Sequence, residues 1–198
     1  MALLRLDDQG RLCLKGAGQG QVSETPLLKE VLLLMDTSGS MAGDKILQAK
    51  NGASDFFKSA SERGYSTGLA VFADRAAMVC DPTVENNAFE IKVAALRIGI
   101  VGGGTDLAAG LDLAGKFKTL TAVVVVTDGQ PNSPKDALRA AAVLKQNGVE
   151  ILCIGTDDAD KAFLDLLATR KDLALHVKAQ NLRTSIGQAT QLLLGSKR

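Results

Sequence analysis

Serine, threonine and aspartate side chains gather in three short, glycine-containing stretches of the chain. The first is DTSGS at residues 36–40, directly after the apolar run VLLLM, and the second is GGGTD at residues 102–106. The third is TDG at residues 127–129, directly after the apolar run LTAVVVV. These stretches offer carboxylate and hydroxyl oxygens, the ligands that a hard divalent cation of the Mg²⁺ type prefers. They contain neither cysteine nor histidine, so they suit zinc poorly.

The spacing within the stretches allows five oxygen-bearing side chains to meet. Ser38 and Ser40 are alternate residues with small neighbours, so both hydroxyls can turn toward one point near the Asp36 carboxylate. A glycine run places Thr105 at the start of a helix, and Asp128, like Asp36, follows an apolar run. We therefore predict one site that combines two carboxylates with three hydroxyls.

Apolar runs alternate with helical patterns from residue 31 onward, and this rhythm predicts the elements that position the site. Strands are expected at 31–35, 66–73, 120–127, 149–155 and 173–179, and helices at 45–63, from 106, at 134–148, 158–171 and 181–195. Continuous runs such as AVVVV suit parallel strands that helices cover on both faces. We expect an α/β fold with a doubly wound, mostly parallel open sheet, in which ligands bind at the carboxyl ends of the strands.

Two finer features of the fold follow from the spacing. The run AAMVC at 76–80 comes too soon after the preceding strand for a helical crossover, so it predicts a hairpin and one antiparallel edge strand. The last helix should bury one face that carries Leu182, Ile186, Ala189 and Leu193.

The chain divides into a short extension and one domain. Residues 1–30 contain LLRLDDQGRLCLKG, which alternates around Asp-Gln-Gly like a hairpin, and then the glycine-rich connector GAGQGQ. Residues 31–198 are long enough for one domain with a substantial core.

Composition argues against several classes of partner and location. The net charge is +1, without a basic stripe, and the chain has one Tyr and no Trp, so nucleic acid and anionic membrane surfaces are not expected partners. There is no long apolar run, and Asp7 and Asp8 stand where a signal peptide needs apolar residues, which predicts a cytoplasmic protein. Three widely spaced cysteines do not form a disulfide framework, and Cys153 is expected to be a buried apolar residue. The oligomeric state does not follow from the sequence.

The three polar stretches, in this order and in this strand-helix context, resemble the loops of the von Willebrand factor A domain. The metal-ion-dependent adhesion site (MIDAS) of that family reads DxSxS, then Thr, then Asp. The resemblance implies that the hydroxyls of Ser38, Ser40 and Thr105 bind a cation directly or through water. It also implies that Asp36 and Asp128 hold the cation largely through water.

The resemblance extends from residue 31 to about residue 194 and carries further expectations. Asp106 would be a neighbouring carboxylate that orients a serine hydroxyl, and Gly39 would let the backbone pass close to the ion. Hydroxyl ligands leave the cation electrophilic, so an Asp or Glu of a protein partner can complete its coordination. We therefore expect a non-enzymatic protein-binding module, bacterial and cytoplasmic, that serves as adaptor or subunit of a larger assembly. Its cofactor would be Mg²⁺, with Mn²⁺ or Ca²⁺ as substitutes.

The competing interpretation is a phosphohydrolase of the haloacid-dehalogenase type. It would use Asp36 as nucleophile, with Thr127, Lys145 and an acidic pair at 157–158 in supporting roles. The interpretation lacks the acid that should stand two residues after the nucleophile, where Ser38 occurs. It also leaves the GGGTDL stretch without a use. We expect Asp157, Asp158 and Asp160 to cap a helix rather than bind a second ion, and the single histidine, His176, to be structural.

Overall fold

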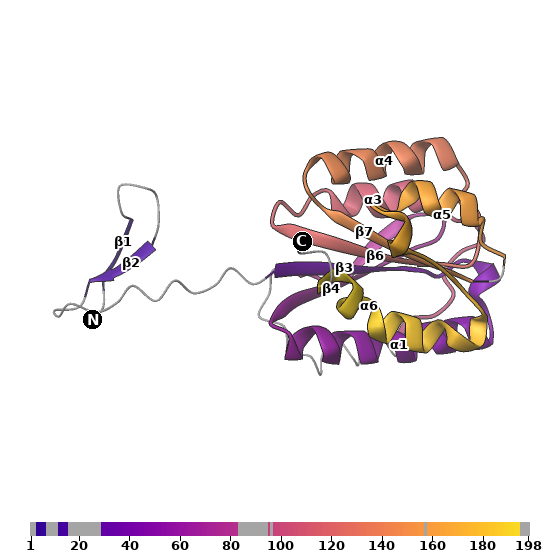
Figure 1. The fold of residues 1–198 in the computed structure, drawn as a ribbon, viewed down its shortest axis with the longest axis horizontal. Helices are drawn as coiled ribbons and strands as arrows, with labels where there is room; N and C mark the ends of the chain where they lie inside the picture. Colours follow the sequence, from indigo (N-terminus) through magenta and orange to yellow (C-terminus); the bar gives the residue numbers. More distant parts are fainter. Residues whose placement is uncertain are drawn as a thin grey trace.

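A six-stranded sheet with helices on both faces forms the main body of the chain (Figure 1). The computed structural model describes residues 3–6, 12–15, 29–82, 95, 97–156 and 158–194. The strands of this sheet are β3 (Lys29–Asp36), β4 (Tyr65–Phe72), β5 (Ala76–Cys80), β6 (Leu120–Thr127), β7 (Glu150–Thr156) and β8 (Ala174–Val177). Their order is β5-β4-β3-β6-β7-β8, and every neighbouring pair is parallel except β4 and β5. The predicted doubly wound sheet with one antiparallel edge strand is confirmed.

The order of the strands reverses between β3 and β6, which are neighbours although β4 and β5 lie between them in the sequence. Successive strands are added on one side of β3 up to β5 and then on the other side from β6 to β8. The two strands that flank the reversal therefore end in loops that diverge over opposite halves of the sheet. Such a point is where open α/β sheets hold their ligands.

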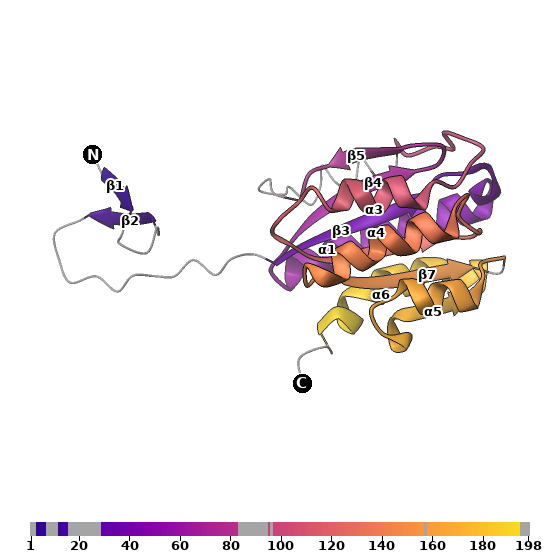
Figure 2. The same cartoon turned by 90° about the horizontal axis from the view of Figure 1, so that it is seen from above.

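Helices of the described residues cover both faces of the sheet (Figures 1 and 2). The helices are α1 (Asp44–Glu62), α3 (Leu107–Ala114), α4 (Pro134–Gln146), α5 (Lys161–Leu167) and α6 (Leu182–Leu194), with short 3-10 turns at Gly39–Met41, Lys171–Leu173 and Ala179–Asn181. Helices α1 and α6 lie together on one face, and α3, α4 and α5 lie on the other. None of the helices in the described residues is long and apolar enough to span a membrane.

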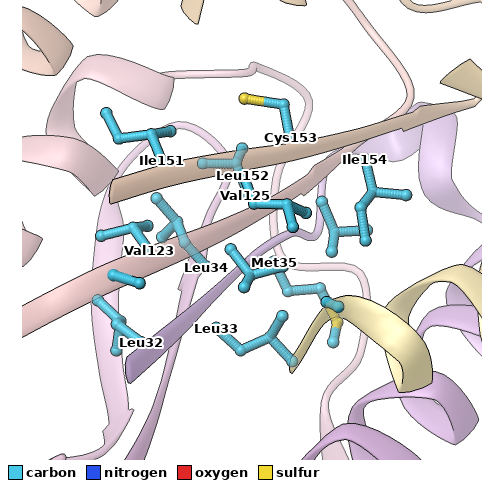
Figure 3. Close-up of a cluster of buried hydrophobic side chains, with 14 of the residues drawn as sticks. Leu32, Leu33, Leu34, Met35, Val123, Val125, Ile151, Leu152, Cys153 and Ile154 are labelled. Atoms are coloured by element: carbon cyan, nitrogen blue, oxygen red, sulfur yellow. The ribbon is translucent and has the colours of Figure 1, made fainter. Parts of the chain in front are cut away.

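The central strands are buried on both faces, which explains their uninterrupted apolar runs. Residues Val31–Met35 of β3 and Val123–Val126 of β6 have no exposed surface, and they pack against β7 in the middle of the sheet (Figure 3). Cys153 lies in this core, where burial raises the pKa of its thiol, as its expected apolar role requires. The edge strand β5 instead alternates between exposed and half-buried residues.

Glycine lets α1 and α6 approach closely. A Cβ added at Gly52 of α1 would lie 2.9 Å from the Arg183 carbonyl oxygen and from the Ile186 Cβ of α6. The predicted apolar face of α6 is buried, as expected: Leu182, Ile186 and Ala189 have no exposed surface, and Leu193 is buried as well. Helix α6 is therefore an integral part of the core.

Two short strands precede the sheet. Strand β1 (Leu3–Leu6) pairs with β2 (Leu12–Lys15) in an antiparallel arrangement, with Leu3 opposite Lys15. The pairing agrees with the alternating pattern around Asp-Gln-Gly. The glycine-rich connector lies outside the described residues, so the division at residue 30 stays a prediction.

Candidate metal centre

The two predicted carboxylate ligands lie at the carboxyl ends of the two strands that flank the reversal of strand order. Asp36 is the last residue of β3, and Asp128 directly follows the last residue of β6, Thr127. The pairing of Met35 with Val126 brings both ends to the same edge of the sheet. Neighbouring strands are about 4.8 Å apart, so the two carboxylates project from adjacent strand ends. Both carboxylates are fully buried.

The DTSGS loop turns its alternate residues in opposite directions. The Thr37 amide and hydroxyl both donate to the Phe72 carbonyl oxygen at the end of β4, at 2.8 and 3.1 Å. Ser38 and Asp36 face the other way, and the Ser38 amide donates to Asp36 Oδ1 at 2.8 Å. The 3-10 turn that follows buries Met41 and returns Ser40 toward Ser38. The local sequence thus holds both serine hydroxyls on the side of the Asp36 carboxylate.

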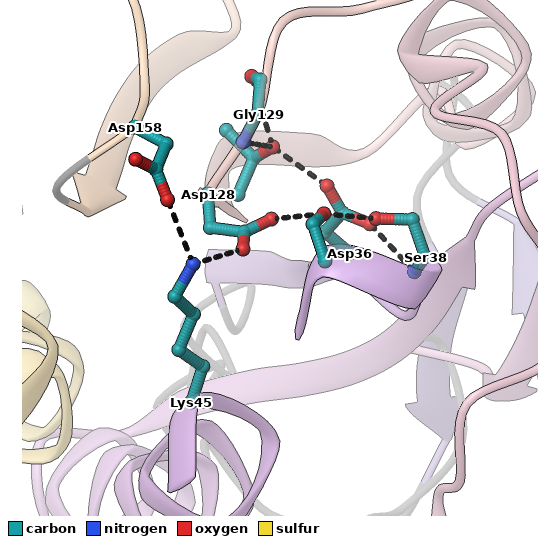
Figure 4. A network of polar contacts seen from close by, with 8 residues as sticks. Asp36, Ser38, Lys45, Asp128, Gly129 and Asp158 are labelled. Atoms are coloured by element: carbon teal, nitrogen blue, oxygen red, sulfur yellow. Dashed lines mark hydrogen bonds and ion pairs between the residues drawn. The ribbon is translucent and has the colours of Figure 1, made fainter. Parts of the chain in front are cut away.

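A chain of hydrogen bonds joins four of the five predicted ligands (Figure 4). The hydroxyls of Ser38 and Ser40 lie 3.1 Å apart, and Ser40 Oγ donates to Asp128 Oδ1 at 2.7 Å. The Thr127 hydroxyl donates to Asp36 Oδ2 at 2.7 Å, which ties the end of β6 to the end of β3. Ser38 is buried, whereas Ser40 is exposed, so the network opens to solvent at Ser40.

Thr105, the fifth predicted ligand, is held beside this network by its backbone. Gly102 forms a parallel bridge with Ser38, three residues before Thr105. The Thr105 amide donates to Asn132 Oδ1 at 3.0 Å, and the Asn132 amide donates to the Thr105 carbonyl oxygen at 2.9 Å. Thr105 is buried. All three polar stretches therefore meet at one edge of the sheet.

Asp74, which sequence reasoning did not single out, explains the glycine run before Thr105. Its Oδ1 accepts a hydrogen bond from the Gly104 amide at 2.7 Å, and its Oδ2 accepts one from the Gly103 amide at 3.2 Å. A Cβ added at Gly102 or Gly104 would overlap this carboxylate. An aspartate in the tight turn between two strands, VFADRA, is the sequence signal that could have pointed to such an anchor.

Asp106 and Gly39 are the two remaining residues that the sequence predicted near the metal. Asp106 caps α3, because its Oδ1 accepts a hydrogen bond from the Ala109 amide at 3.0 Å. Its expected role of orienting a serine hydroxyl stays a prediction. Gly39 begins the 3-10 turn and is exposed at the mouth of the network.

The electrostatics of the network leave negative charge for a cation. Burial raises the pKa of Asp36, although hydrogen bonds from Ser38 and Thr127 partly offset this effect. Asp128 has one cationic neighbour, Lys45, whose Nζ lies 2.6 Å from Asp128 Oδ2. Among the described residues Asp128 thus has a cationic partner and Asp36 has none, and a buried charge without compensation is costly.

The donor set fits a hard divalent cation. Its side-chain donors are all oxygens, two of them carboxylates, and Mg²⁺ uses one or two protein carboxylates together with water. In the part of the chain that the structure describes, no three His, Cys, Asp or Glu side chains group as metal ligands, so neither a zinc cluster nor an all-carboxylate cage competes with this site.

The phosphohydrolase interpretation needs Lys145 near Asp36, and the structure places the two residues apart. Helix α4 leads away from the carboxyl edge over about 20 Å, and Lys145 near its end lines a pocket of about 440 Å³ with Lys29 and Glu150, the first residues of β3 and β7. Lys145 Nζ donates to the carbonyl oxygens of Leu166 and Ala168, at 2.9 and 2.8 Å. It therefore lies at the edge of the sheet opposite Asp36.

The other residues set aside in the sequence have structural roles or lie outside the described part. Asp160 caps α5, accepting hydrogen bonds from the amides of Ala162 and Phe163, whereas Asp158 contacts Lys45 instead of a helix end. Residue 157 is outside the described residues. His176 is exposed on β8, with Nε2 3.2 Å from the Ala159 carbonyl oxygen.

Comparison with known proteins supports the same assignment of fold and family. A sequence model described as the von Willebrand factor type A domain matches residues 30–191. A search of curated proteins gave no match.

Several solved structures share the fold at low sequence identity. Proximal thread matrix protein 1 from the mussel byssus, in a structure with a zinc-occupied MIDAS motif, is 21% identical with a TM-score of 0.72, over 84% of this chain and 46% of that one. The vWF domain of the type V pili tip protein Mfa5 from Porphyromonas gingivalis is 14% identical with a TM-score of 0.74, over 86% and 97%. Manganese-loaded TRAP protein from Plasmodium vivax is 22% identical with a TM-score of 0.63, over 71% and 62%. The chain spans about half the length of the mussel protein.

Proposed function

The chain belongs to the von Willebrand factor type A domain family, and from this premise we propose that it is a non-enzymatic protein-binding module with a metal-dependent adhesion site. Domains of this family are protein-interaction modules that often carry a MIDAS. The proposed site holds a divalent cation, and an Asp or Glu side chain of a protein partner completes the coordination of that cation.

One observation carries the proposal: the continuous network from Asp36 through Ser38 and Ser40 to Asp128 at the reversal of strand order. These four side chains, with Thr105, would hold the cation, and the bound cation would supply a hard Lewis acid for a carboxylate oxygen. Thr127 and Asn132 would keep the ligands in register, since they join the ends of β3 and β6 to the Thr105 loop.

The identity of the cation is part of the proposal. We propose Mg²⁺ as the cellular ion, with Mn²⁺ or Ca²⁺ as substitutes, because the donor set consists of hard oxygen ligands. Two of the structural neighbours carry zinc and manganese, as their descriptions state, which supports a divalent cation as a class.

We also propose that the domain works in the cytoplasm as adaptor or subunit of a larger assembly. Cys153 is an unbridged thiol buried in the core, as expected in a reducing compartment. The partner would be a protein; the net charge of +1 gives no support for nucleic acid or an anionic membrane as partner.

Affinity capture from the native extract tests this function. The baits are the full wild-type chain, Thr105→Ala and Thr119→Ala, each in Mg²⁺ and in chelator. Thr119→Ala is the control, because the Thr119 hydroxyl donates to Glu30 at the opposite edge of the sheet. We expect a partner that wild type and Thr119→Ala retain only with Mg²⁺ and that Thr105→Ala loses. A partner retained equally by all baits in chelator, or phosphatase turnover on a generic ester that requires Asp36, would contradict the proposal.

A further inference from the structure

Lys45 lies between the candidate metal centre and solvent. It is the second residue of α1, which starts after a turn at Gly43 with a φ of +79°. Its Nζ is 2.6 Å from Asp128 Oδ2 and 3.1 Å from Asp158 Oδ2 (Figure 4). Lys45 thus bridges a fully buried carboxylate and one whose side chain is 76% exposed.

The two bonds of Lys45 differ in strength because their surroundings differ. Asp128 is shielded from water, so its attraction to the ammonium group is weakly screened. Asp158 is exposed, and an exposed ion pair contributes little. Burial disfavours the Lys45 charge, but the hydrogen bonds to Asp128 and Asp158 outweigh it and raise the pKa of Lys45. Lys45 is therefore cationic throughout the neutral range.

A cation that binds to Asp128 must share this carboxylate with Lys45. Asp128 Oδ1 already accepts the Ser40 hydroxyl, and Oδ2 accepts Lys45. A divalent cation held by Asp36 and Asp128 would share the Asp128 carboxylate with the ammonium group, and the two positive charges would repel each other. Asp36 and Asp128 together balance the two charges of a dication, so the ammonium group of Lys45, which the exposed Asp158 compensates only weakly, adds positive charge to the loaded site.

We propose that the Lys45 ammonium group competes with the metal for the Asp128 carboxylate. It stabilises Asp128 when no metal is bound and lowers the affinity of the site for divalent cations. The interaction of Lys45 with Asp158 reduces this competition. This inference rests on the proposed function, because it assumes that the site binds a cation. Its consequence is that the chain holds its metal less tightly than its ligand set alone would allow. Lys45 is a positioning residue here, since it acts through Asp128.

Calorimetric titration of the full chain with Mn²⁺ tests the inference. We expect Lys45→Met to bind Mn²⁺ about tenfold more tightly than wild type, because both the competing bond and the repulsion are lost. Asp158→Asn should bind it about threefold more weakly, because Lys45 then interacts with Asp128 alone. The double variant should match Lys45→Met, and Lys45→Arg, which keeps the charge, should stay near wild type. Lys58→Met, an exposed lysine of the same helix, is the matched control and should not change the affinity.

A second measurement separates charge competition from a general structural role. In chelator, Lys45→Met should melt at a lower temperature than wild type, because Asp128 loses its cationic partner. Saturating Mn²⁺ should then raise its melting temperature by more than it raises that of wild type. Unchanged or weaker Mn²⁺ binding by Lys45→Met, with wild type binding normally, would overturn this inference alone. A wild type that binds no Mn²⁺ would overturn the proposed function together with it.

Discussion

At the scale of single residues, the site places two carboxylates where water cannot reach them. Each oxygen of Asp36 has a neutral donor, the Ser38 amide or the Thr127 hydroxyl, whereas Asp128 has Ser40 and Lys45. These hydrogen bonds offset only part of the effect of burial on the carboxylate, so the pKa of Asp36 is raised. Burying these carboxylates does not stabilise the fold by itself, and a bound cation would compensate their buried charge.

Replacing the Asp36 charge should separate stability from binding. Because the folded state disfavours the ionised Asp36 carboxylate, Asp36→Asn should melt in chelator at the same temperature as wild type or a few degrees higher. The same variant should bind Mn²⁺ at least tenfold more weakly, since an amide is a poor ligand for a hard cation. Differential scanning calorimetry with and without Mn²⁺ measures both effects. A large loss of stability in chelator would show that Asp36 serves the fold itself.

The anchor of the Thr105 loop gives a second prediction at this scale. Asp74→Ala removes the acceptor of the Gly103 and Gly104 amides, so hydrogen exchange at these two amides should become faster. Metal binding should weaken several-fold, because Thr105 loses its fixed position, while the melting temperature should change little. Arg75→Ala, at the next residue of the same turn, is the control. Exchange rates that stay the same in both variants would exclude Asp74 as an anchor.

At the scale of the elements, the reversal of strand order brings the polar loops together. Strand β3 supplies Asp36 and the loop to α1, β6 supplies Asp128, and the turn after β4 supplies Asp74. Helices α1 and α6 support this edge from one face, and their contact depends on Gly52. The site is therefore built on rigid elements, as positioning of ligands requires.

Filling the space at Gly52 should disrupt the contact between α1 and α6. A Cβ at this position lies 2.9 Å from atoms of Arg183 and Ile186, so Gly52→Val must push the helices apart and should cost about 1–3 kcal/mol. Urea denaturation measures the cost, with Lys58→Ala on the exposed side of the same helix as the control. A neutral or stabilising Gly52→Val would mean that the two helices can separate without cost.

The sequence predicts the elements well because their signals are local. Apolar runs, glycines and the short gap before AAMVC indicate strands, helix starts and the hairpin, and three spaced motifs indicate the proposed metal ligands. Lys45 and Thr127 had no such signal for their roles, and Asp74 had only its place in a tight turn, because each acts through a residue far away in the chain. The position of Asp106 directly before an apolar helical run also suits an N-cap, and the structure shows this cap.

At the scale of the whole molecule, the hydrophobic core and the polar site are separate. The core lies in the middle of the sheet between the helices, whereas the proposed ligands lie in loops at the carboxyl edge. The fold therefore does not need the metal for its hydrophobic stabilisation. This separation distinguishes an adhesion site from a structural metal site, where the metal supplies folding energy.

The domain should accordingly remain folded in chelator. Its circular-dichroism spectrum at room temperature should be the same with and without metal, and added Mg²⁺ should raise the melting temperature only by the amount that mass action gives. Unfolding by chelator at room temperature would mean that the metal is structural.

Mn²⁺ titration of wild type, Asp128→Ala and Asp112→Ala tests the central claim most directly. Asp128 is fully buried in the network, whereas Asp112 is exposed on α3 and serves as the control. We predict one Mn²⁺ bound by wild type and by Asp112→Ala with equal affinity, and binding at least a hundredfold weaker in a natively folded Asp128→Ala, because a single carboxylate remains to compensate the ion. Equal Mn²⁺ binding by all three proteins, or no binding by wild type, would contradict a metal site at this edge of the sheet.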